Sequence, residues 1–300
     1  MTALARLAAY AAALAIIAAV AAGLGYAVGP LGEPDEVTHS DPVHQDTDPV
    51  DDHTEKGDMT SDQNGHNRET EAASGLAVAS SGYQLVLEDA ALPTGRPGPF
   101  RFRIVGRDGE AVREFDLEGG VRMHLIVVRR DLTRYQHLHP ELRPDGTWET
   151  ELALPEAGVY RAFADFERAG DKTVLGADLF ATGEFVPAPL PPPDTALEVD
   201  GYDVRLEGEA HASRETELVF SVRHGGEPVE LEPYLGAQGH LVALRAGDLA
   251  YLHVHPLRDA DRGEIAFAAS FPTPGPYRLF LQVKDGGRVQ TAAFTLEVRR

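Results

Sequence analysis

From Tyr83 onward the chain consists of short runs in which apolar and polar residues alternate, such as YQLVLED, PFRFRIVG and VYRAFADF. Gly, Pro or Asp residues bound each run, and a new run begins after about ten residues. Alternation with a period of two places successive side chains on opposite faces of a strand. No long stretch has the 3.6-residue period of a helix. The pattern therefore predicts an all-β fold of short strands.

This strand pattern occurs twice. The run GYQLVLED at residue 82 is answered by GYDVRLEG at residue 201, and LPEAGVYRAF by FPTPGPYRLF, at offsets of 116 to 119 residues. Two copies of about 100 residues with seven or eight strands fit tandem immunoglobulin-like β-sandwiches. Cupredoxin-like barrels are the alternative, because strand count alone does not separate the two. We predict one domain at residues 76–187 (repeat 1), a stiff proline-rich connector at 188–196, and a second domain at 197–300 (repeat 2).

The first 75 residues follow a different pattern. Residues 7–29 contain no charged side chain and are long enough to cross a bilayer as a helix, so residues 1–30 are predicted to be a membrane anchor. Arg6 before this stretch and acidic residues after it place the rest of the chain outside the cytoplasm. A cleaved signal peptide is the alternative, and it would make the protein secreted. Residues 31–75 have no aromatic residue and 13 acidic against two basic side chains, which predicts a disordered acidic linker.

Charge and composition exclude several classes of function. The net charge of −21 argues against nucleic acid as a partner. The chain has no cysteine, which excludes disulfides, thiolate metal sites and cysteine nucleophiles. No paired carboxylates, nucleophile motif or nucleotide-binding loop is apparent, so we do not expect an enzyme.

Histidines are the candidate site residues. Each repeat has an H-x-H pair followed by proline, with a third histidine 13 residues before the pair. The intervening residues predict a β-hairpin that sets His124 opposite His137, and His240 opposite His253. All three rings of a repeat then share one face, joined there by Tyr135 or Tyr251 as a neighbour in the second coordination shell. The predicted metal ligands are His124, His137, His139, His240, His253 and His255.

Three neutral imidazoles suit Cu²⁺, Zn²⁺ or Ni²⁺, and the usual order of metal affinities favours copper over zinc. A three-histidine site also leaves one coordination position open. Two other interpretations remain open at this point. The histidines could form a structural polar cluster, or they could respond to protonation.

The two motif regions, HLIVVRRDLTRYQHLHPELRPDGTW and PYLGAQGHLVALRAGDLAYLHVHP, resemble a largely uncharacterised family of exported bacterial proteins that is common in actinobacteria. The resemblance covers roughly residues 82–300. It implies tandem immunoglobulin-like domains and an association with heavy-metal or copper handling. The six histidines match the positions of the duplicated family motif.

These observations predict a membrane-anchored metal-binding protein outside the cytoplasm, with one three-histidine site in each repeat. Sequestration or delivery of copper, or of zinc, would bring it near a metal transporter or a copper enzyme. The alternative is a metal-free immunoglobulin-like scaffold or protein-interaction module of the cell envelope, because a fold by itself does not decide function.

Overall fold

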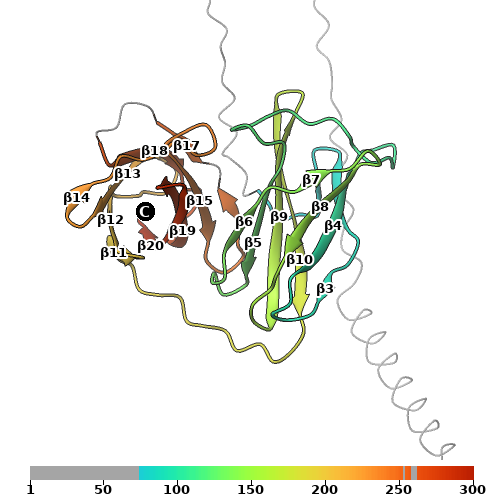
Figure 1. Ribbon diagram of the computed structural model, residues 1–300, viewed down its shortest axis with the longest axis horizontal. Coiled ribbons are helices and arrows are strands. Elements are labelled where there is room, and N and C mark those ends of the chain that lie inside the picture. Colours follow the sequence, from blue (N-terminus) through green and yellow to red (C-terminus); the bar gives the residue numbers. More distant parts are fainter. Residues whose placement is uncertain (1–73, 253, 258–261) are drawn as a thin grey trace, which may run out of the picture. The chain divides into compact units, whose positions relative to one another are not determined.

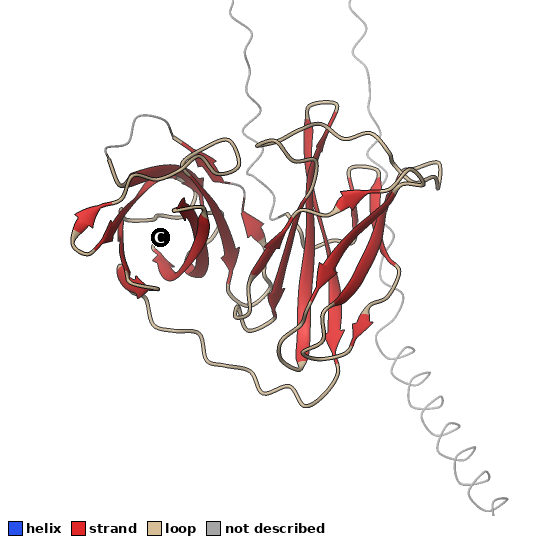
Figure 2. Cartoon of the chain, in the orientation of Figure 1, coloured by secondary structure: helices blue, strands red, loops and turns tan. Residues whose placement is uncertain are grey.

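The computed structural model describes residues 74–252, 254–257 and 262–300, and these ranges consist of strands, turns and loops (Figure 2). The all-β class and the two β-sandwich domains are confirmed. Within the described ranges, no helix has the length and apolar character needed to cross a bilayer. The predicted anchor and all but the last two residues of the predicted linker lie outside these ranges, so both stay predictions.

Repeat 1 is a sandwich of two five-stranded sheets (Figure 1). The first has the order β1-β2-β4-β8-β7, with strands β1 (Ala79–Ser80), β2 (Tyr83–Leu87), β4 (Gly98–Val105), β8 (Thr147–Leu152) and β7 (Glu141–Leu142). The second has the order β3-β10-β9-β5-β6, with strands β3 (Ala91–Leu92), β10 (Asp171–Ala181), β9 (Gly158–Arg168), β5 (His124–Arg129) and β6 (Gln136–Leu138). The hairpin β5-β6, which carries the first histidines, therefore lies at an edge of the second sheet.

Repeat 2 has the same two-layer construction. One sheet has the order β11-β12-β13-β18-β17, and β14 also pairs with β13. The strands of this sheet are β11 (Ala196–Val199), β12 (Tyr202–Glu207), β13 (Glu215–His224), β18 (Glu264–Ser270), β17 (Val254–Pro256) and β14 (Glu227–Pro228). The other has the order β16-β15-β19-β20: β16 (Tyr251–Leu252), β15 (Gly239–Arg245), β19 (Gly275–Asp285) and β20 (Arg288–Val298). The chain thus changes sheets between β16 and β17, within the second H-x-H motif.

Most strands bury one face, as their alternation predicts. In β4, for example, Phe100, Phe102 and Ile104 are buried in the core of repeat 1, and the residues between them are more exposed. Burying such a side chain contributes about 1.5–3 kcal/mol, so these residues provide much of the stability of each sandwich.

Strand β5 departs from this rule because all six of its residues are buried. Leu125 and Val127 face the core of repeat 1, whereas Ile126 and Val128 face repeat 2. A continuous apolar run is what a strand with two covered faces requires. The second face belongs to a further apolar cluster, here called the seam, whose buried members are Ile126, Val128, Leu132, Phe163, Val242, Leu244, Leu249, Tyr251 and Phe280.

The two repeats contribute equivalent surfaces to the seam. Ile126 pairs with Phe163 in repeat 1, as Val242 pairs with Phe280 in repeat 2. Tyr135 stacks on Phe280, with ring centroids 4.2 Å apart, and its counterpart Tyr251 contacts Phe163 at 5.4 Å. Reciprocal contacts of this kind are typical of two-fold related subunits. Here both partners belong to one compact unit of a single chain.

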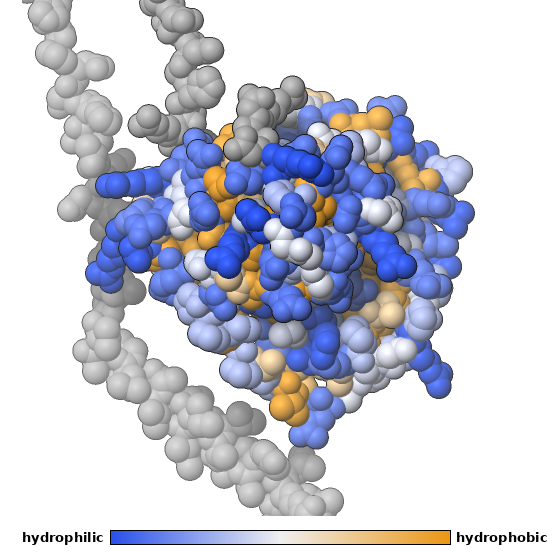
Figure 3. Space-filling model, turned by 60° about the vertical axis from the view of Figure 1, so that its left-hand side comes forward, coloured by the Kyte–Doolittle hydropathy of each residue, from blue (hydrophilic) through white to orange (hydrophobic). Residues whose placement is uncertain are grey.

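The outer surface has no apolar cluster comparable to the seam among the described residues. The face drawn in Figure 3 is mainly polar, and its apolar residues form small separate groups. Among the described residues, exposed apolar side chains such as Leu117, Phe180 and Val186 come from different parts of repeat 1. Isolated apolar residues on a surface need no functional explanation.

Candidate metal centre

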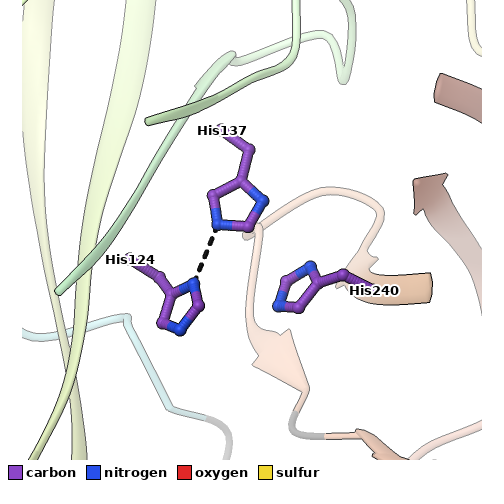
Figure 4. A group of neighbouring side chains, drawn as sticks. All are labelled: His124, His137 and His240. Atoms are coloured by element: carbon purple, nitrogen blue, oxygen red, sulfur yellow. Dashed lines mark hydrogen bonds between the residues drawn. The ribbon is translucent and has the colours of Figure 1, made fainter. Parts of the chain in front are cut away.

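Three histidines meet at the seam (Figure 4). His124 begins β5, His137 lies in β6, and His240 lies in β15 of the other repeat. His124 shares a strand face with Ile126, which pairs with His137, so both rings point toward repeat 2. One ring nitrogen of each histidine lies within 4.8 Å of the corresponding nitrogen of the other two.

The rings pack closely against one another. His124 and His240, which are equivalent residues of the two repeats, stack with an interplanar angle of 10° and centroids 5.3 Å apart. The ring of His137 lies 4.5 Å from that of His240. Nδ1 of His124 lies 2.9 Å from Nε2 of His137, which is a hydrogen-bond distance. The group therefore combines residues of both repeats.

Gln282 of β19 determines which nitrogen of His137 carries the proton. The amide nitrogen of Gln282 donates to Oγ1 of Thr291 at 3.3 Å, which directs its amide oxygen toward His137. Nδ1 of His137 donates to that oxygen at 2.6 Å. In the neutral ring, Nε2 then carries a lone pair directed at His124. A metal-binding histidine is usually held in this way, by a hydrogen bond from its other ring nitrogen.

Burial keeps the imidazole rings of His124 and His137 neutral. It lowers the pKa of His124 to about 4, with a further decrease from nearby His139, against an opposing effect of Glu118. It lowers the pKa of His137 to about 3, although the hydrogen bond with Gln282 acts in the opposite direction. Both imidazoles are therefore unprotonated at pH 7, which is the form that binds metal ions.

A cavity of about 80 Å³ adjoins the group, lined among others by Glu118, His124, Asp165, His240 and Tyr251. The hydroxyl of Tyr251 donates to Oδ2 of Asp165 at 3.0 Å. Nε2 of His124 and Oδ1 of Asp165 are buried without a hydrogen-bond partner among the described residues. Burial, followed by the charge of Glu118, raises the pKa of Asp165 to about 7. The cavity has room for about two water molecules beside the histidines.

The predicted hairpin pairing is wrong by two residues. Ile126, and not His124, lies opposite His137. In repeat 2, Leu244 pairs with Tyr251 and Ala243 with Leu252, a shift of the same size. The turns are longer than expected, but an even shift keeps each side chain on its predicted face.

The remaining predicted ligands lie in different surroundings. The ring of His139 lies 5.3 Å from His124 and 4.7 Å from His137, so the three histidines of repeat 1 do gather on one face. His139 is exposed, and desolvation lowers its pKa. His255 lies in β17, in the sheet opposite the one that holds His240, and is also exposed. His253 lies outside the described residues. Metal binding by these three residues stays a prediction.

The two tyrosines expected near the ligands differ in their contacts. Tyr135 packs into the seam on Phe280, and its hydroxyl has no hydrogen-bond partner among the described residues. Tyr251 reaches across the seam to Asp165 and lines the cavity beside His124. Tyr251 therefore lies near the histidines of the other repeat.

Sequence reasoning missed Asp165, Gln282 and the meeting of His240 with repeat 1. Asp165 pairs with His124, and Gln282 pairs with His240, so the two residues occupy equivalent positions. Their signal was present in the repeated runs VYRAFADF and PYRLFLQV, each of which places a second polar residue four positions after its arginine. Finding it requires the strand pairing as well as the pattern.

Fold and site together define a class: a protein of two tandem β-sandwiches with a buried three-histidine cluster that could hold a metal ion. Residues 77–182 and 197–300 both match the model of one family, a domain of unknown function (DUF8832). The chain therefore belongs to the DUF8832 family and carries its domain twice.

No curated protein matches the sequence. Solved structures that are similar include the Lin-41 filamin domain (15% identity, 36% of this chain and 97% of that chain, TM-score 0.26). The Escherichia coli adhesin FdeC has 13% identity over 75% of this chain and 66% of its own, with a TM-score of 0.27. The Yersinia pseudotuberculosis adhesin InvE has 11% identity over 73% and 60%, with a TM-score of 0.25. At these scores the likenesses carry no weight for function.

Proposed function

We propose that this protein binds one transition-metal ion at the seam, through His124, His137 and His240, and acts in sequestration or delivery of that metal and not as an enzyme. The observation that carries the proposal is the group of three imidazoles whose nitrogens lie within 4.8 Å of one another. The hydrogen bond from His137 to Gln282 supports it, because it presents a lone pair to the group.

Copper is the metal we propose first. The three neutral imidazoles suit Cu²⁺ or Zn²⁺, and the usual order of metal affinities favours copper. Binding of either ion would replace the hydrogen bond between Nδ1 of His124 and Nε2 of His137.

The proposed stoichiometry is one ion per chain, since the ligands come from both repeats. In the part of the chain that the structure describes, one such group is present. The second ion expected from the sequence would be held by His240, His253 and His255. Because His253 lies outside the described residues, that second site stays a prediction.

Titration of the full chain with Cu²⁺ and Zn²⁺ in a calorimeter tests the proposal. We expect about one equivalent of tightly bound Cu²⁺, lost in His137→Ala and equally in His240→Ala, and retained in the control His211→Ala. His211 lies away from the seam, near Arg299 and Arg300. Electron paramagnetic resonance of the copper-loaded protein should show nitrogen ligands. Absence of binding at micromolar metal would leave the metal-free scaffold as the interpretation.

In this proposal, residues 7–29 hold the protein in the cell membrane with both repeats outside the cytoplasm, close to a metal transporter or a copper enzyme. The support is the uncharged apolar stretch in the sequence, which is long enough for a membrane helix. Fractionation of cells should place the chain in the membrane, and added protease should degrade the repeats without lysis. Recovery in the soluble cytoplasm would contradict this location.

A further inference from the structure

Residues 74–77, here called the strap, run across the seam just before strand β1. At one end the strap pairs with repeat 2. The backbone N–H of Tyr251 donates to the carbonyl of Ser74 at 2.9 Å, and the hydroxyl of Ser74 donates to the carbonyl of Tyr251 at 2.7 Å. The strap thus pairs with both the N–H and the carbonyl of Tyr251.

At its other end the strap pairs with repeat 1. The N–H of Gly75 donates to the carbonyl of Val174 at 3.2 Å, and the N–H of Gly176 donates to the carbonyl of Ala77 at 2.9 Å. Val174 and Gly176 both lie in β10. A segment of four residues therefore connects the two repeats by backbone hydrogen bonds.

A buried arginine fixes the middle of the strap. Nη2 of Arg161 donates to the carbonyls of Gly75 and Leu76 at 2.7 and 2.8 Å, and Nη1 contacts Asp178 at 2.9 Å. The equivalent residue in repeat 2 is Arg278, whose buried Nε has no hydrogen-bond partner among the described residues. Leaving a buried donor unpaired is costly, so the strap satisfies a group that the sandwich alone would leave unpaired.

Two glycines allow the strap to lie this close. Gly75 has φ +71°, and a Cβ there would lie 2.6 Å from the ring of Phe163 and 3.1 Å from Cβ of Tyr251. A Cβ on Gly176 would lie 2.0 Å from the carbonyl oxygen of Gly75. In repeat 2 the residue equivalent to Gly176 is Ala293, which is paired with Phe280 as Gly176 is with Phe163. Alanine is therefore compatible with this strand position. Glycine is required in repeat 1 by the carbonyl of Gly75 and by the guanidinium of Arg161, which binds the strap.

We infer that the strap is a built-in clasp, which holds the two repeats closed and positions Tyr251 beside the histidines. Tyr251 connects the two, because its backbone pairs with Ser74 and its hydroxyl donates to Asp165 in the cavity next to His124. The inference of a clasp rests on the observed contacts of the strap alone, whereas the coupling of the clasp to metal binding rests on the proposed function. By reciprocity, strap docking should strengthen metal binding, and metal should strengthen strap docking.

Two substitutions displace the strap from opposite sides. Gly176→Ala acts from repeat 1, and Gly75→Val acts from the strap itself. Their matched controls are Gly98→Ala, in strand β4, and Gly109→Val, at a turn with positive φ; a Cβ at either control position meets nothing within 4 Å. Hydrogen–deuterium exchange of the full chain in chelator follows the amide of Tyr251, and Cu²⁺ titration follows the metal centre.

We expect both strap variants to exchange the Tyr251 amide about tenfold faster or more, while the cores of the repeats keep their protection. Their Cu²⁺ affinity should fall by about tenfold, a typical coupling between sites, and the controls should match the original protein. Unchanged exchange at Tyr251 in both variants would overturn the clasp. Faster exchange with unchanged copper affinity would overturn the coupling. If the unsubstituted protein binds no metal, the proposed function fails while the exchange result still decides the clasp.

Discussion

Acidification should destabilise the metal-free protein through its buried histidines. In an unfolded chain both His124 and His137 have a pKa near 6.5, whereas burial lowers these values to about 4 and about 3 in the folded protein. Below pH 6.5 the unfolded chain therefore binds more protons, so stability falls as the pH falls toward the folded values. At pH 5 the loss amounts to about 2 kcal/mol for each histidine, or about 4 kcal/mol together.

Asp165 acts in the opposite direction. Its pKa is raised to about 7, so the folded protein holds a proton there that the unfolded chain releases above about pH 4. Its contribution to stability therefore improves as the pH falls from 7 to 5, by about 2 kcal/mol. The net loss for the unsubstituted protein is then about 2 kcal/mol, apart from contributions of other groups.

Urea unfolding in chelator at pH 7 and pH 5 measures this dependence, and the double variant His124→Asn/His137→Asn isolates the histidine contribution. The change in unfolding free energy between the two pH values should differ by about 4 kcal/mol between the original protein and the double variant, because other titrating groups cancel in the comparison. Agreement of the two pH dependences within about 1 kcal/mol would refute the conclusion that these rings are buried and neutral.

Three further substitutions test the surroundings of the site. Tyr251→Phe removes the hydroxyl that donates to buried Asp165 and should lower the unfolding free energy by about 1–3 kcal/mol in chemical denaturation, and no change would contradict that hydrogen bond. Gln282→Leu removes the partner of His137 and should weaken Cu²⁺ binding about 10–100-fold in competitive titration, whereas unchanged affinity would show that the ring needs no such support. Phe163→Ala should destabilise the protein by about 3–5 kcal/mol in urea unfolding, and a loss below about 1 kcal/mol would mean that the seam packs loosely.

The sequence alone predicts the strands, the duplication and the common face of the three histidines of repeat 1, because a period of two is visible in one dimension. It does not predict the hairpin register, which depends on turn length. Leu132 and Arg134 both adopt positive φ in the turn between β5 and β6, and no Gly or Asn marks these positions. The predicted pairing of His124 with His137 fails for this reason.

The meeting of His240 with repeat 1 was also beyond the sequence, because it depends on how two folded domains pack. One sign of it was present: the runs HLIVVR and HLVALR are apolar on both faces, which means that both faces are covered. What covers the second face becomes clear only when Ile126 and Val242 are seen in the same cluster.

The equivalent positions of Asp165 and Gln282 have a consequence for how such a site can evolve. Two identical subunits around a true two-fold axis must present the same residue at both places, either two acids or two amides. Fusing the copies into one polypeptide removes that restriction, so a carboxyl can serve one half and a neutral amide the other. The duplication therefore made it possible for the two halves to carry different polar groups at equivalent positions. A dimer of a single-domain ancestor could not have combined a carboxyl with an amide in this way.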